Sequence, residues 1–346
     1  MKALVKTASG KGNIELQERP CPTPGKDDVL IKVNRAGVCG TDVHIEHDRF
    51  ANSPPVTLGH EFSGTIEQIG VNVTGLSKGD RVVSSNNPFA CGQCDLCRAG
   101  NPNLCLDKRA MGIHSDGCFA DYVKLESTLI HKIPDNVTFE QAALTEPLAV
   151  AVQAVAHNCG IEDGDTVVVF GAGAIGLLAA QVARAEGAGQ VIVVGTSRDE
   201  KVRFPCARGL GLHTINVGKG GLVDEILKLT KNRGTDVVVE ASGNAAAIQQ
   251  GSRLLKRTGR MAISGITGKP DVAVDWDHLV SKGVTLHFCY GSVNADWEKG
   301  LQYLSEGKVL TQPLITHQFN LEQWHEAFRS LESLDAIRPV FEIEGT

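Results

Sequence analysis

The chain has 346 residues, a formal net charge of −6 and a charged-residue content of 21%. This length exceeds one ordinary domain, so two domains are expected. A mildly acidic balance with only 5% aromatic residues argues against a nucleic-acid partner and against an anionic membrane surface. The sequence has no run of about 18 consecutive apolar residues and no signal-peptide pattern, so we expect a cytoplasmic protein with no membrane partner.

Residues 1–150 are predicted to be rich in β-strands. Short runs of β-branched and other apolar residues at 29–38, 61–73 and 80–85 are separated by Gly, Asn and Asp. This pattern is typical of short strands in a compact barrel.

Four cysteines lie close together between one strand-like segment and the next. They are Cys91, Cys94, Cys97 and Cys105, in a C-x2-C-x2-C-x7-C pattern. Thiols stay reduced in the cytoplasm, and four converging thiolates make a closed tetrahedral zinc site. The pattern therefore predicts a structural zinc in a lobe at about 88–108, with a disulfide framework as the alternative. Most of the other cysteines are expected to be small buried residues.

From about residue 150 the pattern changes to that of a parallel sheet with helices between its strands. Residues 166–195 contain an apolar strand, a glycine turn, an Ala/Leu-rich helix and a second apolar strand. Residues 235–243 and 259–266 repeat the pattern of an apolar strand followed by glycine. The fold class predicted is α/β, with a doubly wound parallel sheet that runs to about residue 290.

The end of the chain is predicted to hold an amphipathic helix at 297–309 and a strand at 338–344. The pattern alone leaves open which of the two domains these elements complete.

The first apolar strand of the parallel sheet leads into a G-x-G-x-x-G turn. Gly171, Gly173 and Gly176 form this turn, and Ile175 lies inside it. The three glycines permit a tight turn, a close approach of a pyrophosphate and close packing of the helix on the strand. The free N–H groups at the start of the helix then face the phosphates. The position of the turn between strand and helix predicts a dinucleotide site, with a purely structural turn as the alternative.

The end of the second strand bears on the choice between NAD and NADP. Enzymes that use NAD usually carry Asp or Glu at this position, but here the strand ends in Gly195, and Ser197 and Arg198 follow. A hydroxyl and a guanidinium favour NADP. Two alternatives stay open: Asp199 or Glu200 could serve NAD, and Arg198 could be an ordinary solvated charge.

Further candidate ligands are scattered through the first half of the chain. Cys39 and His60 are ligands of the catalytic-zinc type, and Glu61 and Glu146 could supply oxygen ligands. Any one of these residues alone is more readily explained as a core or surface residue.

Taken together, these motifs resemble the zinc-dependent medium-chain dehydrogenases, the alcohol and polyol dehydrogenase superfamily. The GHEFSG block at 59–64, the four-cysteine lobe and the GAGAIG turn occur in the order and spacing of that family. Residues 133–150, IPDNVTFEQAALTEPLAV, look especially like the sorbitol (polyol) dehydrogenase branch. The resemblance implies a GroES-like catalytic domain of residues 1–150 and 291–346. It also implies a Rossmann dinucleotide-binding domain of residues 151–290, with the active site in the cleft between the two.

The resemblance also implies two zinc ions per chain and a role for each matching residue. Cys39, His60 and Glu146 would bind the catalytic zinc, and Glu61 would be a fourth ligand or an outer carboxylate at the catalytic centre. Thr41 would hydrogen-bond the substrate hydroxyl, and His44 would pass its proton to solvent. A Lewis acid of this kind lets an alcohol lose its proton near neutral pH, so that hydride can pass to NADP, or to NAD in the alternative.

One departure from the family weakens the assignment of the substrate. Many polyol dehydrogenases carry an aromatic-Arg-Tyr triplet near the end of the Rossmann domain, and here Cys289 stands where the Arg would be. A secondary alcohol and its ketone are expected as substrate and product, with a polyol or sugar alcohol favoured. A simple secondary alcohol or a 3-hydroxy amino acid is the alternative.

Two rival functions remain: a zinc-free reductase of the same superfamily and a non-catalytic binding protein with this fold. The resemblance further suggests a homo-oligomer, with a tetramer favoured and a dimer as the alternative.

Overall fold

The computed structural model describes residues 1–343 and divides the chain into two compact units. Unit 1 consists of Met1–Glu146, Val293–Ser305 and the part of the chain from Leu314 to residue 343. Unit 2 consists of Pro147–Ser292 and Glu306–Pro313. Residues 344–346 lie outside the described residues. They include the end of the segment expected in the first domain and the last residue of the strand expected at 338–344.

The short segment 306–313 groups with unit 2, although it lies inside the stretch that the resemblance assigns to the first domain. Its attachment has a simple cause. The side-chain amide of Gln181 donates to the carbonyl of Leu310 at 3.1 Å and accepts from the Leu310 N–H at 2.8 Å. These two bonds tie the segment to a helix of the parallel-sheet unit.

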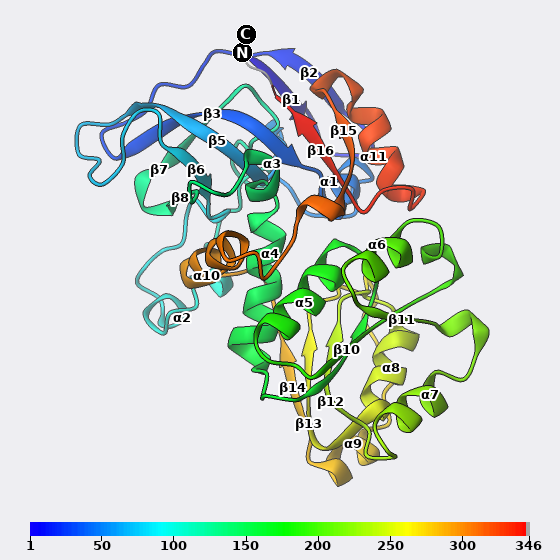
Figure 1. Ribbon diagram of the computed structural model, residues 1–346. Coiled ribbons are helices and arrows are strands. Elements are labelled where there is room, and N and C mark those ends of the chain that lie inside the picture. The colour runs from blue at the N-terminus through cyan, green and yellow to red at the C-terminus, as the bar shows by residue number, and fades with distance from the viewer. Residues whose placement is uncertain (344–346) are drawn as a thin grey trace. The chain divides into compact units, whose positions relative to one another are not determined.

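Unit 1 is built on two sheets (Figure 1). Its strands are β1 (Lys2–Lys6), β2 (Ile14–Glu18), β3 (Asp28–Gly37), β4 (Val56–Thr57), β5 (Glu61–Ile69), β6 (Arg81–Ser84), β7 (Tyr122–Glu126), β8 (Ile130–Lys132), β15 (Ile315–Phe319) and β16 (Arg338–Glu342). One sheet has the order β2-β1-β4, and the other has the order β15-β16-β3-β5-β6-β8, with β7 also paired to β3.

The helices of unit 1 are short and lie between or after these strands. They are α1 (Gly40–Glu46), α2 (Asp95–Arg98), η1 (Pro102–Leu104), η2 (Ser127–Leu129), α3 (Phe139–Ala142), α10 (Asn294–Ser305), η7 (Leu321–Gln323) and α11 (Trp324–Glu332). Helix α4 (Thr145–Val152) contains the residue at which unit 1 gives way to unit 2.

The strands expected at 29–38, 61–73 and 80–85 are present as β3, β5 and β6. Strand β5 ends at Ile69, earlier than expected, because Gly70 donates its N–H to the carbonyl of Asp28 and the chain turns away. Val71 beyond the turn is 85% exposed, so it has no apolar face to join. The β-rich character expected of the first half of the chain is confirmed.

The C-terminal strand completes the main sheet of unit 1. β16 pairs antiparallel with β3 in a register that places Val340 opposite Gly37, and Phe341 packs edge-on against Phe119 in the core. Trp324 and Phe328 of α11 are buried in the same core. The assignment that the sequence pattern left open for this strand is thereby decided.

Unit 2 is a doubly wound parallel sheet. Its strands are β9 (Thr166–Phe170), β10 (Gln190–Gly195), β11 (His213–Asn216), β12 (Thr235–Glu240), β13 (Leu255–Ile263) and β14 (Thr285–Phe288). Its helices are η3 (Gln153–Cys159), α5 (Ala174–Ala185), η4 (Ser197–Asp199), α6 (Arg203–Gly209), η5 (Val217–Lys219), α7 (Leu222–Leu229), α8 (Ala245–Leu254) and α9 (Trp276–Lys282), and η6 (Gln312–Leu314) lies at its last boundary.

The strand order of unit 2 is β11-β10-β9-β12-β13-β14, with every pair parallel. The direction of winding reverses between β9 and β12, which is the switch point where such sheets bind ligands at their carboxyl ends. Val168 and Phe170 of β9 pack with residues of α7 and α8, while Val167 and Val169 are also fully buried and point to the other face. Apolar burial of both faces is what the continuous valine runs predicted, and the α/β fold class is confirmed.

The helix expected at 297–309 is α10, which begins and ends a few residues earlier. It belongs to unit 1, where the ring of Trp297 stacks on His131 with centroids 5.8 Å apart. Within residues 1–343 no helix is long and apolar enough to cross a bilayer.

Candidate functional site

The four predicted zinc cysteines come together in unit 1 around the short helix α2. The sulfur atoms of Cys91, Cys94, Cys97 and Cys105 all lie within 4.8 Å of one another. Sγ–Sγ distances are 3.6 Å for Cys91–Cys105, 3.9 Å for Cys91–Cys97 and 4.0 Å for Cys94–Cys105. Four sulfurs at zinc-bond length from one tetrahedral centre are about 3.8 Å apart, so the cluster has the size of a zinc site.

The backbone around this cluster favours thiolates. The N–H groups of Cys94 and Cys97 point to the sulfurs of Cys91 and Cys94, at 3.3 and 3.5 Å. Hydrogen bonds from the N–H groups of Gln93 and Cys94 lower the pKa of Cys91 to about 7, whereas burial raises the pKa of Cys97 to about 12. All ten cysteines are free thiols, so the disulfide alternative has no support among the described residues.

The second predicted metal site lies where β3 and α1 meet the start of β5, also in unit 1. Cys39 precedes α1, His60 precedes β5, and Glu61 is the first residue of β5. Their ligand atoms lie within 4.8 Å of one another. Gly37 is paired with Glu61 across β3 and β5, and a Cβ at Gly37 would clash with the Glu61 carboxylate. A glycine at that position is therefore what admits the carboxylate.

The buried polar atoms of this cluster fit a cation. Glu61 is completely buried, and neither of its carboxylate oxygens has a hydrogen-bond donor among residues 1–343. The guanidinium of Arg338 in β16 lies 3.2 Å from Oε1 and supplies one positive charge, whereas Oε2 has neither a hydrogen-bond donor nor an ion-pair partner among residues 1–343, which is costly for a buried carboxylate. A thiolate, an imidazole and a carboxylate in reach of one point form a donor set suited to zinc.

The predicted ligand Glu146 lies in the first turn of α4 and is buried, but it is not part of this three-residue cluster. Its Oε1 accepts a hydrogen bond of 2.6 Å from the Asn86 side-chain amide. Burial raises the pKa of Glu146 to about 7, and His60 and Arg338 oppose this shift by their charge. Glu146 therefore lies in the electrostatic neighbourhood of His60, while Glu61 is the carboxylate in reach of His60 and Cys39.

Two residues of this site were not found from the sequence. Arg338 of β16 is buried, lies 3.2 Å from Glu61 Oε1 and donates to the carbonyl of Val38. Nothing in a local pattern links it to Cys39, since β16 reaches this place only by pairing with β3.

Asp42, inside the GTDVH run, is the other. Its Oδ2 accepts from the Cys39 N–H at 2.8 Å, and its Oδ1 lies 3.7 Å from His60 Nδ1. The Asp42–His60 contact is an ion-pair distance and not a hydrogen bond, and the position of Asp42 in the first turn of α1 was the available signal.

The two predicted relay residues lie on α1. Thr41 Oγ1 is 3.6 Å from Cys39 Sγ, and His44 is exposed one turn further along the helix. This order, from the metal ligand to solvent, is compatible with a proton path.

The predicted dinucleotide turn follows β9 at the switch point of unit 2. Gly171 has φ +104°, and a Cβ at Gly176 would collide with the carbonyl of Gly171. A Cβ at Gly173 would meet nothing within 4 Å, so the chain leaves open space there. Ile175 is half-buried in the first turn of α5. Gly173 caps this twelve-residue helix without any side-chain hydrogen bond, so the N–H groups of the first turn stay available to a phosphate.

The loop after β10 has its carboxylates already engaged. Asp199 Oδ2 accepts from the Thr196 N–H at 2.7 Å and from the Thr196 hydroxyl at 3.0 Å. Asn216 donates to Glu200 at 2.9 Å and Lys219 pairs with it at 3.0 Å, and these bonds lower the pKa of Glu200 to about 2.

Gly195 itself has no room for a side chain, because a Cβ would lie 2.7 Å from Asp199 Oδ2. Ser197 accepts a long bond of 3.3 Å from Asn216, and among residues 1–343 the side chain of Arg198 forms no ion pair.

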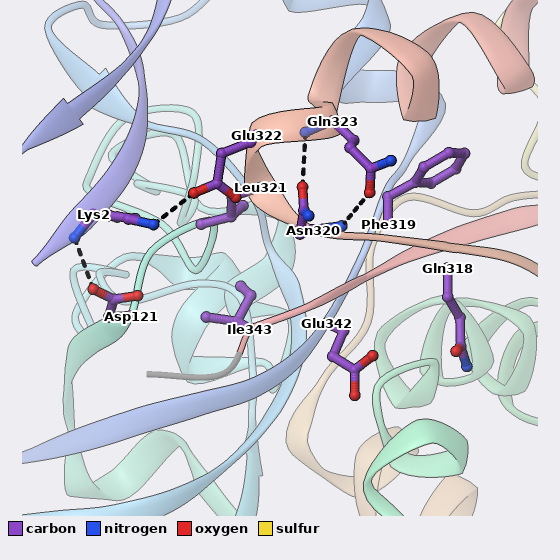
Figure 2. A pocket seen from close by; sticks show the side chains of 10 residues that line it. All are labelled: Lys2, Asp121, Gln318, Phe319, Asn320, Leu321, Glu322, Gln323, Glu342 and Ile343. Atoms are coloured by element: carbon purple, nitrogen blue, oxygen red, sulfur yellow. Dashed lines mark hydrogen bonds and ion pairs between the residues drawn. The ribbon is translucent and has the colours of Figure 1, made fainter. Parts of the chain in front are cut away.

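Figure 2 shows a surface pocket of unit 1 that is separate from these sites. It is lined by Lys2, Asp121, Gln318, Phe319, Asn320, Leu321, Glu322, Gln323, Glu342 and Ile343. Lys2 is engaged with Glu322 at 2.6 Å and, through its N–H, with Asp121, while Glu342 pairs with Arg35. The pocket contains none of the predicted site residues, so it does not support a second catalytic centre.

Comparison with known proteins places the chain in a family. Residues 25–135 match the alcohol dehydrogenase GroES-like domain, and residues 174–306 match the zinc-binding dehydrogenase family. The sorbitol dehydrogenase of Halalkalibacterium halodurans is 41% identical over 98% of this chain and 98% of its own length. The L-threonine 3-dehydrogenase of Legionella pneumophila (strain Corby) is 36% identical over 96% and 97%.

A solved structure has the same fold over its full length. A chain from Sinorhizobium meliloti 1021, described as a zinc-binding dehydrogenase and bound to NADP, superposes with a TM-score of 0.92 at 30% identity and covers 99% of this chain and 98% of its own. The resemblance inferred from the sequence is confirmed. The chain belongs to the zinc-dependent medium-chain alcohol dehydrogenase superfamily, in its sorbitol dehydrogenase-like branch, and is an oxidoreductase of that family.

Proposed function

We propose that the protein interconverts a secondary alcohol and its ketone by hydride transfer to NADP, with a polyol or sugar alcohol as the favoured substrate. The observation that carries this proposal is the cluster of Cys39, His60 and Glu61, whose ligand atoms lie within 4.8 Å of one another and whose buried Glu61 Oε2 has no hydrogen-bond donor among residues 1–343. Such a donor set is suited to a catalytic metal.

Within this proposal each residue has a defined task. Cys39, His60, Glu61 and Glu146 hold the catalytic zinc, with Glu61 already in reach of Cys39 and His60 and Glu146 as the further carboxylate ligand. The four cysteines of the lobe hold a second, structural zinc. Zinc, when bound, supplies Lewis-acid chemistry that lowers the pKa of a substrate hydroxyl toward neutrality.

Proton movement is the task of α1. The Thr41 hydroxyl accepts the hydrogen bond of the substrate hydroxyl, and the exposed His44 delivers the proton to solvent. Gly171, Gly173, Ile175 and Gly176 hold the pyrophosphate of the cofactor. The nicotinamide, when bound, supplies the hydride acceptor.

A substrate screen tests the proposal. Polyols, sugars, simple secondary alcohols and 3-hydroxy amino acids are each assayed with NADP and with NAD on protein of known zinc content. We expect the highest kcat/KM with a polyol or sugar alcohol. Removal of the catalytic zinc, with the zinc of the four-cysteine lobe retained, should abolish turnover. Turnover that survives this removal would instead support a zinc-free reductase, and a zinc-loaded protein inert toward every class would support a binding protein.

A 3-hydroxy amino acid is the second candidate substrate, and one observation favours it. Cys289 is buried and its thiol donates to the carbonyl of His287, so no guanidinium for a polyol stands at this position. The similarity to an L-threonine 3-dehydrogenase points the same way. A kcat/KM for such a substrate above that of every polyol would replace the favoured substrate with this one.

The preference for NADP rests on the loop after β10. The carboxylates of Asp199 and Glu200 are already held by neighbouring donors, which makes both poorer acceptors for a ribose diol. Arg198 and Ser197 remain to donate charge-assisted bonds to a 2′-phosphate.

We therefore expect Arg198→Ala to lower kcat/KM with NADP by about ten- to a hundredfold, since such bonds contribute about 1.5–3 kcal/mol. The value with NAD should change little. Arg253→Ala, at an exposed arginine of α8, is the matched control and should alter neither value. An equal loss with both cofactors, or a wild type that already prefers NAD, would contradict the assignment of this loop.

We also propose a homo-oligomer in the cytoplasm, a tetramer rather than a dimer. β14 is an edge strand paired only with β13 among the described residues, and Phe288 of β14 and Trp276 and Val280 of α9 are each at least 65% exposed. An open sheet edge and exposed large apolar side chains support self-association. The molar mass in solution distinguishes monomer, dimer and tetramer.

The proposed cytoplasmic location has separate support, because ten free cysteines fit a reducing compartment.

A further inference from the structure

The segment directly after β6 reaches into the candidate catalytic site. Asn86 donates its side-chain amide to Glu146 Oε1 at 2.6 Å, and its own carbonyl accepts the N–H of Met111 at 3.0 Å. A hydrogen bond from an amide to a buried carboxylate is charge-assisted, and its short length fits that class. Asn86 thus occupies one oxygen of Glu146 and fixes the plane of the carboxylate.

The residue before Asn86 is held from the opposite direction. Ser85 Oγ donates to Asn294 Oδ1 at 2.8 Å and lies 3.0 Å from His131 Nε2, which therefore donates to it. His131 in turn stacks on Trp297 of α10. Because Ser85 and His131 are buried, this set of bonds fixes the backbone from which Asn86 extends.

The two carboxylates near His60 are thus held differently. Glu61 faces a cation of the protein, the Arg338 guanidinium at 3.2 Å. Glu146 instead accepts a hydrogen bond from a neutral amide, which orients the group. Outer partners that orient a ligating carboxylate in this way tune metal affinity.

We propose that Asn86 is a positioning residue for the catalytic zinc. Its amide holds Oε1 of Glu146, so that the other carboxylate oxygen is presented to the metal. The hydrogen bonds of Ser85 to α10 and β8 anchor this arrangement. The inference rests on the proposed function, because it assumes a zinc held by Cys39, His60 and Glu146.

The experiment compares zinc affinities rather than activity alone. Asn86→Leu keeps the branched shape of the side chain and removes the donor. Asn72→Leu is the matched control, since Asn72 also donates to a carboxylate, Asp27 at 2.9 Å, but at an exposed place. Zinc is withdrawn from each protein by a competing chelator, and the zinc of the four-cysteine lobe serves as an internal reference.

We expect Asn86→Leu to weaken the catalytic zinc by about ten- to a hundredfold, the range typical for loss of such a partner. The reference zinc and the unfolding midpoint of the zinc-free protein should stay at the wild-type values, as should all values for Asn72→Leu. Asn86→Ala is made as a second variant without the donor and should give the same result.

Unchanged affinity in both Asn86 variants would overturn the inference while leaving the proposed function intact. A weaker affinity at both zinc sites together with a lower unfolding midpoint of the zinc-free protein would show a merely structural role, and would also overturn it. A wild-type protein that binds zinc only in the four-cysteine lobe would overturn the proposed function itself, and with it the inference about Asn86.

Discussion

Replacement of His60 by alanine should abolish turnover while leaving cofactor affinity nearly unchanged. His60 supplies the imidazole of the Cys39–His60–Glu61 cluster in unit 1, whereas the glycine turn for the dinucleotide lies in unit 2. Lewis-acid stabilisation contributes several kcal/mol to such a reaction, so the loss of kcat should be about a thousandfold or more. The measurements are kcat, the zinc content, which should fall from two to one per chain, and the dissociation constant of NADP.

The control for this variant is His213→Ala. His213 is exposed and lies 3.4 Å from Glu225, an ion pair of the kind that contributes little to stability. It should retain both zincs and full activity. If cofactor affinity in His60→Ala fell in step with activity, the variant would be misfolded rather than specifically inactive, and two retained zincs would rule out His60 as a ligand.

Replacement of Cys94 by serine should remove the other zinc and destabilise the protein. Cys94 supplies one of the four sulfurs and also caps α2, where its sulfur accepts the Cys97 N–H. Closed zinc sites contribute folding free energy directly, so we expect a loss of several kcal/mol and a lower unfolding midpoint. Zinc analysis of the folded fraction and thermal unfolding measure the two effects.

Cys21→Ser provides the matched control, because Cys21 is an exposed thiol outside both clusters. This variant should keep two zincs per chain and the wild-type unfolding midpoint. Treatment of the wild type with a strong chelator should reproduce the lower midpoint of Cys94→Ser. Retention of two zincs in Cys94→Ser would contradict the structural-zinc assignment.

Features encoded by neighbours in the chain could be predicted from the sequence. The four lobe cysteines lie within 15 residues, so their spacing alone restricts how the sulfurs can converge, and they do converge. The glycines at 171 and 176 meet because a turn of this length between a strand and a helix has few conformations. The alternation of apolar strands and helices in unit 2 likewise specifies a parallel sheet.

Features that depend on the packing of distant segments could not be predicted. Arg338 reaches Glu61 only through the β3–β16 register, and Asn86 reaches Glu146 across 60 residues of chain. The sequence alone could not tell whether Glu61 or Glu146 would lie within reach of Cys39 and His60. Nor could it tell that the carboxylates of the loop after β10 would be engaged by donors: Asp199 by Thr196, and Glu200 by Asn216 and Lys219.

The physical reason is one of range. Local motifs act through the conformations of a few adjacent residues, which composition and spacing constrain directly. The orientation of a buried carboxylate is determined instead by which hydrogen-bond donors and cations the tertiary fold brings to it. These partners come from strands and helices up to 277 residues away in the chain, as Arg338 does in its ion pair with Glu61. The sequence by itself therefore determined the two ligand sets and the cofactor turn as candidates, and the tertiary structure decided how each carboxylate is held.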